Sequence, residues 1–166
     1  MVWDISRAID TGEYTNTTTE AATSEDVHFS ADGTKMYVSD GTTDSIYQYT
    51  LTSAWDVSTA SYASKSKDVS TETTAPAAMF FKSDGLKFYV SGSSTIFQYT
   101  LSTAWDISTA SYDSKSLNTT EASSVNGIYF KADGTKVVSL GGNNGIVVIY
   151  TLSTPWDVST GTTDTN

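Results

Sequence analysis

Trp105-Asp106-Ile107-Ser108 is the stretch that decides the fold, because the chain repeats it at a nearly constant spacing. With Ile or Val in third place, the tetrapeptide begins at Trp3, Trp55, Trp105 and Trp156, and successive copies are 52, 50 and 51 residues apart. Each interval holds one Asp-Gly pair: Asp32-Gly33, Asp84-Gly85 or Asp133-Gly134. A fixed period indicates one supersecondary unit written several times. We expect a single repeat domain over residues 1–166, with units at about 3–54, 55–104 and 105–155 and a partial fourth at 156–166.

The second repeat contains the signals of four short strands. Its first candidate strand is the apolar run 79–81, and the turn 83–86 holds an Asp-Gly pair that suits a tight hairpin. Segments 87–91 and 96–101 are rich in aromatic and β-branched residues, and a polar fourth strand follows at 111–117. Four antiparallel strands in about 50 residues predict a β-propeller blade, and a solenoid of stacked hairpins is the competing architecture.

Segment 29–39, Phe-Ser-Ala-Asp-Gly-Thr-Lys-Met-Tyr-Val-Ser, resembles the core of the YVTN-type propeller repeats of bacterial and archaeal surface proteins. The block 99–111 is similar to repeats of phage structural proteins and environmental bacterial proteins. Both motifs imply an all-β fold of three four-stranded propeller-type blades, in a ring or array completed by oligomerisation. They imply much less about an activity.

Composition excludes several classes of protein. The formal net charge is −10, and the nine Lys and Arg residues are scattered, so we expect no nucleic-acid partner. No apolar run approaches the ~20 residues of a membrane helix, so we expect no membrane partner. Residues 1–4 contain no signal-peptide feature. We therefore expect an extracellular, cell-surface or virion protein, whose signal peptide was removed or which leaves its cell in a virion.

The phase of the repeat suggests a partner. The chain opens on a segment of fourth-strand type, at about 9–15, and only a short Gly/Thr-rich tail follows the last copy of the tetrapeptide. We expect this N-terminal strand to complete the last blade of a neighbouring copy, because an unpaired strand edge invites pairing. Two chains would then form a six-bladed homodimer ring. If the rotation does not close, the same head-to-tail contact gives a filament.

Aromatic and acidic residues recur at fixed places in every unit. The Trp-Asp pairs are Trp3-Asp4, Trp55-Asp56, Trp105-Asp106 and Trp156-Asp157. We expect the indole to cover the edge of the blade and the carboxylate to cap the following Ser-Thr turn. The alternative is a set of glycan clamps. In that case Tyr49, Tyr99 and Tyr150, each six residues before a Trp, are the candidate ligand contacts.

The sequence offers little catalytic apparatus. His28 is the only histidine, and its counterparts in the other repeats are Phe80 and Tyr129, which favours a packing role over a catalytic one. Cysteine is absent. Asp40 and Asp44 bracket one loop, but a calcium site needs six to eight oxygen ligands, so we expect a solvated loop. We predict no catalytic residue, no cofactor and no metal site.

Two triplets match the N-glycosylation pattern, and each begins 13 residues after a Trp: Asn16-Thr17-Thr18 and Asn118-Thr119-Thr120. Both are candidate glycosylation sites. For the whole chain we predict a non-enzymatic building block of an extracellular or virion assembly, a fibre, tail or surface appendage, joined by strand exchange. The alternative is a lectin-like, glycan-binding propeller module. A hydrolase ranks third, because no recurring residues place acids and His at the propeller axis.

Overall fold

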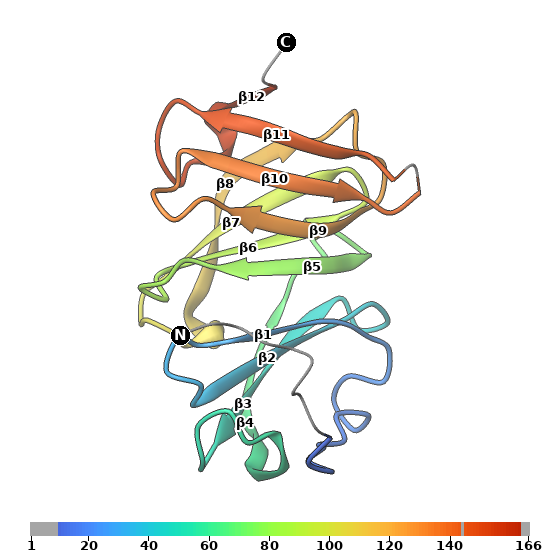
Figure 1. The fold of residues 1–166 in the computed structure, drawn as a ribbon, viewed down its shortest axis with the longest axis vertical. Helices are drawn as coiled ribbons and strands as arrows, with labels where there is room; N and C mark the ends of the chain where they lie inside the picture. The colour runs from blue at the N-terminus through green and yellow to red at the C-terminus, as the bar shows by residue number, and fades with distance from the viewer. Residues whose placement is uncertain (1–9, 144, 164–166) are drawn as a thin grey trace.

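The computed structural model describes residues 10–143 and 145–163, and these residues form three antiparallel four-stranded sheets (Figure 1). Blade 1 contains β1 (Ser24–Phe29), β2 (Lys35–Asp40), β3 (Ser45–Leu51) and β4 (Ala60–Asp68). Blade 2 contains β5 (Pro76–Phe81), β6 (Lys87–Gly92), β7 (Thr95–Leu101) and β8 (Ala110–Asn118). Blade 3 contains β9 (Val125–Phe130), β10 (Lys136–Gly141), β11 (Val147–Leu152) and β12 (Gly161–Thr163). The prediction of an all-β chain with three four-stranded blades is confirmed.

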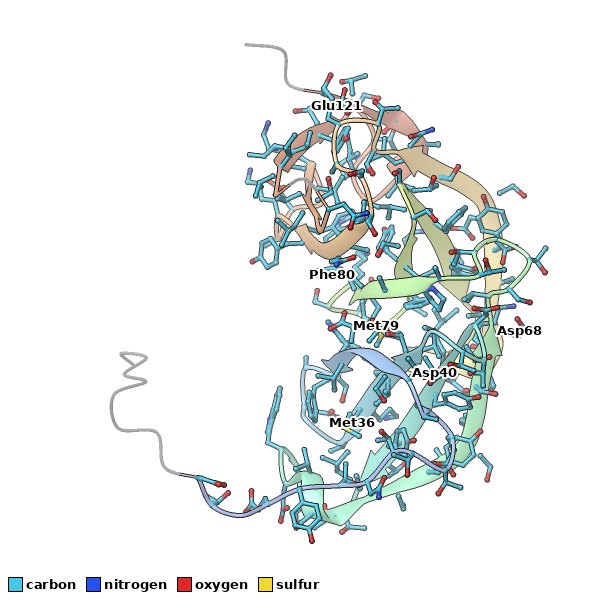
Figure 2. The ribbon with its side chains drawn as sticks, turned by 90° about the vertical axis from the view of Figure 1, so that its right-hand side faces the viewer. Met36, Asp40, Asp68, Met79, Phe80 and Glu121 are labelled. Atoms are coloured by element: carbon cyan, nitrogen blue, oxygen red, sulfur yellow. The ribbon has the colours of Figure 1, made fainter. Side chains whose placement is uncertain are left out.

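The blades follow one another along a curve (Figure 2). β1, β5 and β9 are the first strands of their sheets and contact one another in succession at the inner edge. The long strands β4 and β8 lie on the opposite, convex side, at the right of Figure 2. Three 3-10 turns, η2 (Val57–Thr59), η3 (Ile107–Thr109) and η4 (Val158–Thr160), lead into the fourth strands. No helix among the described residues could cross a membrane.

Each Trp-Asp pair is built onto the Asp-Gly turn of its own blade. In blade 2 the N–H of Trp105 donates to the carbonyl of Gly85 over 2.9 Å, and the indole lies so close that a Cβ at Gly85 would sit 2.4 Å from Nε1. Asp106 accepts the N–H of Ser108 and so caps η3. Blades 1 and 3 repeat this arrangement at Trp55, Gly33 and Asp56 and at Trp156, Gly134 and Asp157. Trp3 and Asp4 lie outside the described residues.

The same turn joins each blade to the one before it. The hydroxyl of Tyr89 in blade 2 donates to the carbonyl of Trp156 in blade 3 over 2.7 Å. Gln98 Oε1 accepts the N–H of Val158 over 3.1 Å. Tyr89 and Gln98 are both buried, and burial raises the pKa of the Tyr89 hydroxyl. Buried polar groups need such partners, so these two bonds fix how blade 3 docks on blade 2.

The joint between blades 1 and 2 has the same chemistry. Tyr37 donates to the carbonyl of Trp105 over 2.7 Å, and Gln48 Oε1 accepts the N–H of Ile107 over 2.9 Å. Two further contacts occur in both joints. The ion pairs are Lys65–Asp106 and Lys115–Asp157, and the serine bonds run from Ser39 to the carbonyl of Ala77 and from Ser91 to that of Val125. The two joints therefore share these four kinds of polar contact.

The chain completes blade 3 with its own residues. β12 pairs with β11, with Gly161 opposite Leu152 and Thr163 opposite Tyr150. Residues 10–23 contain no strand, whereas the fourth-strand segment expected at about 9–15 would have required one; residue 9 lies outside the described part. The expectation that a neighbour's N-terminal strand supplies this position is wrong. The reason is the geometry at the end of η4. Gly161 follows η4 with the same extended backbone that Ala60 and Ala110 have after η2 and η3, so three residues are enough to pair with β11.

Replacing Gly85 with Ala should cost more than the backbone strain alone. Gly85 and Gly145 have similar positive φ angles of 71° and 65°, but only Gly85 lies against an indole, and nothing lies within 4 Å of a Cβ at Gly145. We expect Gly145→Ala to lower the free energy of unfolding by about 1 kcal/mol. Gly85→Ala should lower it by about 3 kcal/mol or more, because Trp105 must move. Urea denaturation measures both, and equal losses would show that the indole contact contributes nothing.

Candidate functional site at the inner edge of the blades

The inner strands depart from the repeat at their second and third residues. The second position is occupied by Glu25 in β1, Ala77 in β5 and Asn126 in β9. The third position is Asp26 in β1, where the other two strands have Ala and Gly. A residue shared by every repeat serves the repeat, so these unshared polar side chains are the candidates for function.

A hollow of about 240 Å³ lies over Ala77, with Glu25 and Asn126 among its walls. Glu25 lies against Gly41, where a Cβ would be 3.1 Å from Oε1. Asn126 lies against Gly142 in the equivalent loop, where a Cβ would be 2.2 Å from Nδ2. Ala77 is too short to fill the corresponding place in blade 2. The space between the carboxylate of blade 1 and the carboxamide of blade 3 is therefore left open.

Two serines of the same hollow have a constrained backbone. Ser93 and Ser124 have φ angles of 52° and 57°, in the left-handed region that non-glycine residues rarely adopt. The Ser93 carbonyl accepts the N–H of Val125 over 2.6 Å, and the Ser124 carbonyl accepts that of Gly142 over 2.7 Å. Such strained positions often occur at functional sites. These bonds hold two hydroxyl-bearing residues in the lining of the hollow.

Asp26 joins blades 1 and 2 beside the hollow. Its Oδ2 accepts the N–H of Met79 in β5 over 2.7 Å, and its Oδ1 accepts the N–H of Val27. Burial raises the pKa of this carboxyl, although both backbone bonds oppose the shift. Asp26 therefore positions β1 against β5, while its neighbour Glu25 is exposed to the hollow.

A second hollow, of about 330 Å³, lies toward the other end of the inner strands and is mainly aromatic. His28, Phe80 and Tyr129 occupy equivalent positions there, beside Trp105 and Trp156. The His28 ring centroid lies 5.9 Å from that of Phe80, and burial lowers the pKa of His28 to about 4. The imidazole is thus uncharged at neutral pH and packs among rings.

The tyrosines considered as ligand contacts lie inside the blades. Tyr49, Tyr99 and Tyr150 are buried, and their hydroxyls donate to Glu20, Glu72 and Glu121, respectively. None of the three lines the hollows described above. The structure therefore places them in the core and away from the candidate site.

The loop acids and the two sequons are also placed by the structure. Asp40 is buried rather than solvated: burial disfavours its charged form, but the N–H groups of Thr43, Thr23 and Thr42 outweigh this and lower its pKa. The described residues contain no group of three or more acidic or His side chains that could hold a metal ion. Asn16 and Asn118 are both exposed. Their glycosylation stays a prediction.

Family models and curated proteins give no match to this chain. Solved structures do. A protein of Bacteroides fragilis described as a 6-phosphogluconolactonase has a TM-score of 0.60 and 10% identity, over 84% of this chain and 36% of that one. Its counterpart in Bacteroides uniformis has a TM-score of 0.60 and 11% identity, over 85% and 38%. The periplasmic gluconolactonase of Pseudomonas aeruginosa has a TM-score of 0.58 and 13% identity, over 86% and 38%.

The shared feature is the β-propeller fold. The chain spans well under half the length of these structures, and at such low sequence identity the similarity shows the fold alone. The resemblance to propeller repeats is confirmed at the level of the fold, and the comparisons give no support to the finer link with YVTN-type or phage repeats.

The comparisons contradict the expected function. The neighbours named here are lactonases, which are hydrolytic enzymes, whereas we expected a non-enzymatic fibre, tail or appendage subunit, or a glycan-binding module. Both expectations, and the absence of enzymatic activity, are wrong. The physical reason is that repeated Trp, Asp and Gly residues report how blades are built, and a fold does not determine an activity.

Replacing His28 with Phe, the residue at this place in blade 2, should remove a pH dependence of stability. The pKa of His28 is about 4 when folded and 6.5 as a reference value. As pH falls from 6.5 toward 4, the unfolded chain binds this proton first, so the native protein should lose about 2 to 3 kcal/mol that His28→Phe retains. The raised pKa of Asp26 makes stability increase as pH falls, which is the opposite effect. Because Asp26 is present in both proteins, its effect cancels when the two are compared. Urea denaturation across this range tests the difference, and parallel curves would contradict it.

Proposed function

We propose that the three blades of this chain form a lactone hydrolase, with the hollow over Ala77 as the substrate site. The observation that carries the proposal is that Glu25 and Asn126 line the same hollow at the inner edge. Both are polar side chains that the other repeats do not share. The lactonase descriptions of the structural neighbours support the same reaction class.

Lactone hydrolysis needs a base for the attacking water and a donor for the oxygen that becomes negative. The Glu25 carboxylate takes a proton from water as its oxygen attacks the carbonyl carbon of the lactone. The Asn126 amide donates a hydrogen bond to the developing oxyanion. When the bond between the carbonyl carbon and the ring oxygen breaks, the proton returns from Glu25 to the departing oxygen. The product is an open-chain hydroxy acid, and Glu25 is a carboxylate again.

The walls of the hollow favour an uncharged substrate. The described residues that line it include no Lys and no Arg, and among them Glu25 is the only charged side chain. Phosphate recognition relies on Arg, Lys or backbone N–H groups, and a carboxylate repels a phosphate. We therefore propose an unphosphorylated sugar lactone as the substrate class. Ser93 and Ser124 line the hollow and would contact the hydroxyl groups of this sugar.

We also propose a location outside the cytoplasm. The support is the periplasmic location of the gluconolactonase neighbour. The acidic, cysteine-free composition is compatible with such a compartment, since it requires no particular redox environment.

Acid release from glucono-1,5-lactone, followed in a pH-stat above the spontaneous rate, tests the activity. We expect Glu25→Gln to lower kcat by about 100-fold or more, because the base is lost. The control Glu13→Gln, at an exposed glutamate outside the hollow, should leave kcat unchanged. A native rate equal to the spontaneous one, or full activity in Glu25→Gln, would contradict the proposal. A preference for the 6-phosphorylated lactone would contradict the substrate class alone.

A further inference from the structure

The far face of each blade carries the residues that receive the next blade. In blades 1 and 2 three of these positions are polar and identical, as Tyr37, Ser39 and Gln48 and as Tyr89, Ser91 and Gln98. The pairings of β10 with β9 and β11 place Val138, Leu140 and Ile149 at these positions in blade 3. All three hydrogen-bonding side chains have been replaced by aliphatic ones.

These aliphatic residues belong to one exposed apolar surface. Tyr129, Val138 and Ile149 lie opposite one another across β9, β10 and β11, and Leu140 lies opposite Val147 in the next row. Four of the five side chains are strongly exposed: Tyr129 by 65%, Val147 by 62%, Ile149 by 44% and Leu140 by 43%. We name the surface formed by these five residues the blade 3 end face.

The blade 3 end face does not fit the opposite end of another copy. A head-to-tail contact would bring it against the Trp55-Asp56-Val57 turn of blade 1, as the internal joints bring Tyr89 and Gln98 against the equivalent turn of blade 3. Val138 and Ile149 can neither donate to the Trp55 carbonyl nor accept the N–H of Val57. A polar group that is buried without a partner weakens a contact, so the head-to-tail arrangement is disfavoured.

We propose that the blade 3 end face binds the same face of a second copy about a two-fold axis. When two such apolar surfaces pack as stacked sheets, the Trp55 carbonyl and the Val57 N–H of both copies stay in water. The contact is isologous, which means that both copies use the same face. The three strands and two side-chain rows of this face extend over roughly 15 by 12 Å, and the exposed parts of its five side chains amount to roughly 400 Å². Two copies would therefore remove about 800 Å² from water at most, which is the range of weak, transient contacts. We expect a weak dimer, with a dissociation constant of about micromolar or above.

Sedimentation velocity from about 1 to 200 µM tests the proposal. The weight-average mass should rise from 17.8 kDa toward twice this value and stop there. Val147→Lys should abolish the rise, because it buries a charge in the contact. Ile149→Gln restores the residue of the other blades and should weaken the dimer about tenfold. Leu86→Lys, at an exposed leucine outside the blade 3 end face, is the matched control and should dimerise as the native chain does.

Three results would overturn the proposal. A native chain that stays monomeric at every concentration would show that the blade 3 end face binds no second copy. Growth beyond two copies, or a dimer that Ser58→Lys in the blade 1 turn also abolishes, would indicate head-to-tail association instead, because only that contact uses the turn of blade 1. Dimers of unchanged affinity in both Val147→Lys and Ile149→Gln, with native circular dichroism spectra, would place the contact elsewhere.

Discussion

The rest of the structure depends on the hold that each blade has on the Trp-Asp turn of the next. A tyrosine hydroxyl and a glutamine carbonyl meet a main-chain carbonyl and a main-chain N–H, as with Tyr89 and Trp156 or Gln98 and Val158. All four groups are in or beside the apolar core, where an unmade hydrogen bond is costly. A blade that shifted or rotated would break both bonds together. The joint therefore sets the curve along which the blades are placed.

That curve creates the candidate site. It brings β1, β5 and β9 into contact, so that the second residues of three strands face a common space. Glu25 and Asn126 are far apart in the sequence and belong to blades that are not adjacent in the chain. They share a hollow because the blade between them carries only Ala77 at this place. The proposed chemistry is thus a consequence of a repeat whose copies differ at one inner position.

Much of the fold could be predicted from the sequence. The repeat of Trp55, Trp105 and Trp156, the Asp-Gly turns and the alternating strands are local signals, and they placed β5 to β8 within a few residues of their observed bounds. The joints could not be predicted, because Tyr37 and Trp105 are 68 residues apart and nothing local pairs them. The completion of blade 3 was also missed, since three residues of Gly and Thr give almost no strand signal.

The candidate site was harder to predict. Comparison of the repeats drew attention to His28, whose environment proves to be aromatic packing. The same comparison applied three residues earlier would have separated Glu25 from Ala77 and Asn126. It could not have shown that the short Ala77 leaves a hollow, because this follows from the spacing of neighbouring blades. The repeated Trp and Asp residues contribute to the joints between blades and do not line the hollow over Ala77.

Amide hydrogen exchange measured by NMR tests the central claim most directly. Val57, Ile107 and Val158 occupy the same position in three equivalent turns, but only Ile107 and Val158 meet a glutamine of a preceding blade. If the joint protects these groups, the amide hydrogens of Ile107 and Val158 should exchange at least about 100-fold more slowly than that of Val57. Similar exchange at all three amides would contradict it, because the turn would then be protected, or exposed, without any help from a neighbouring blade.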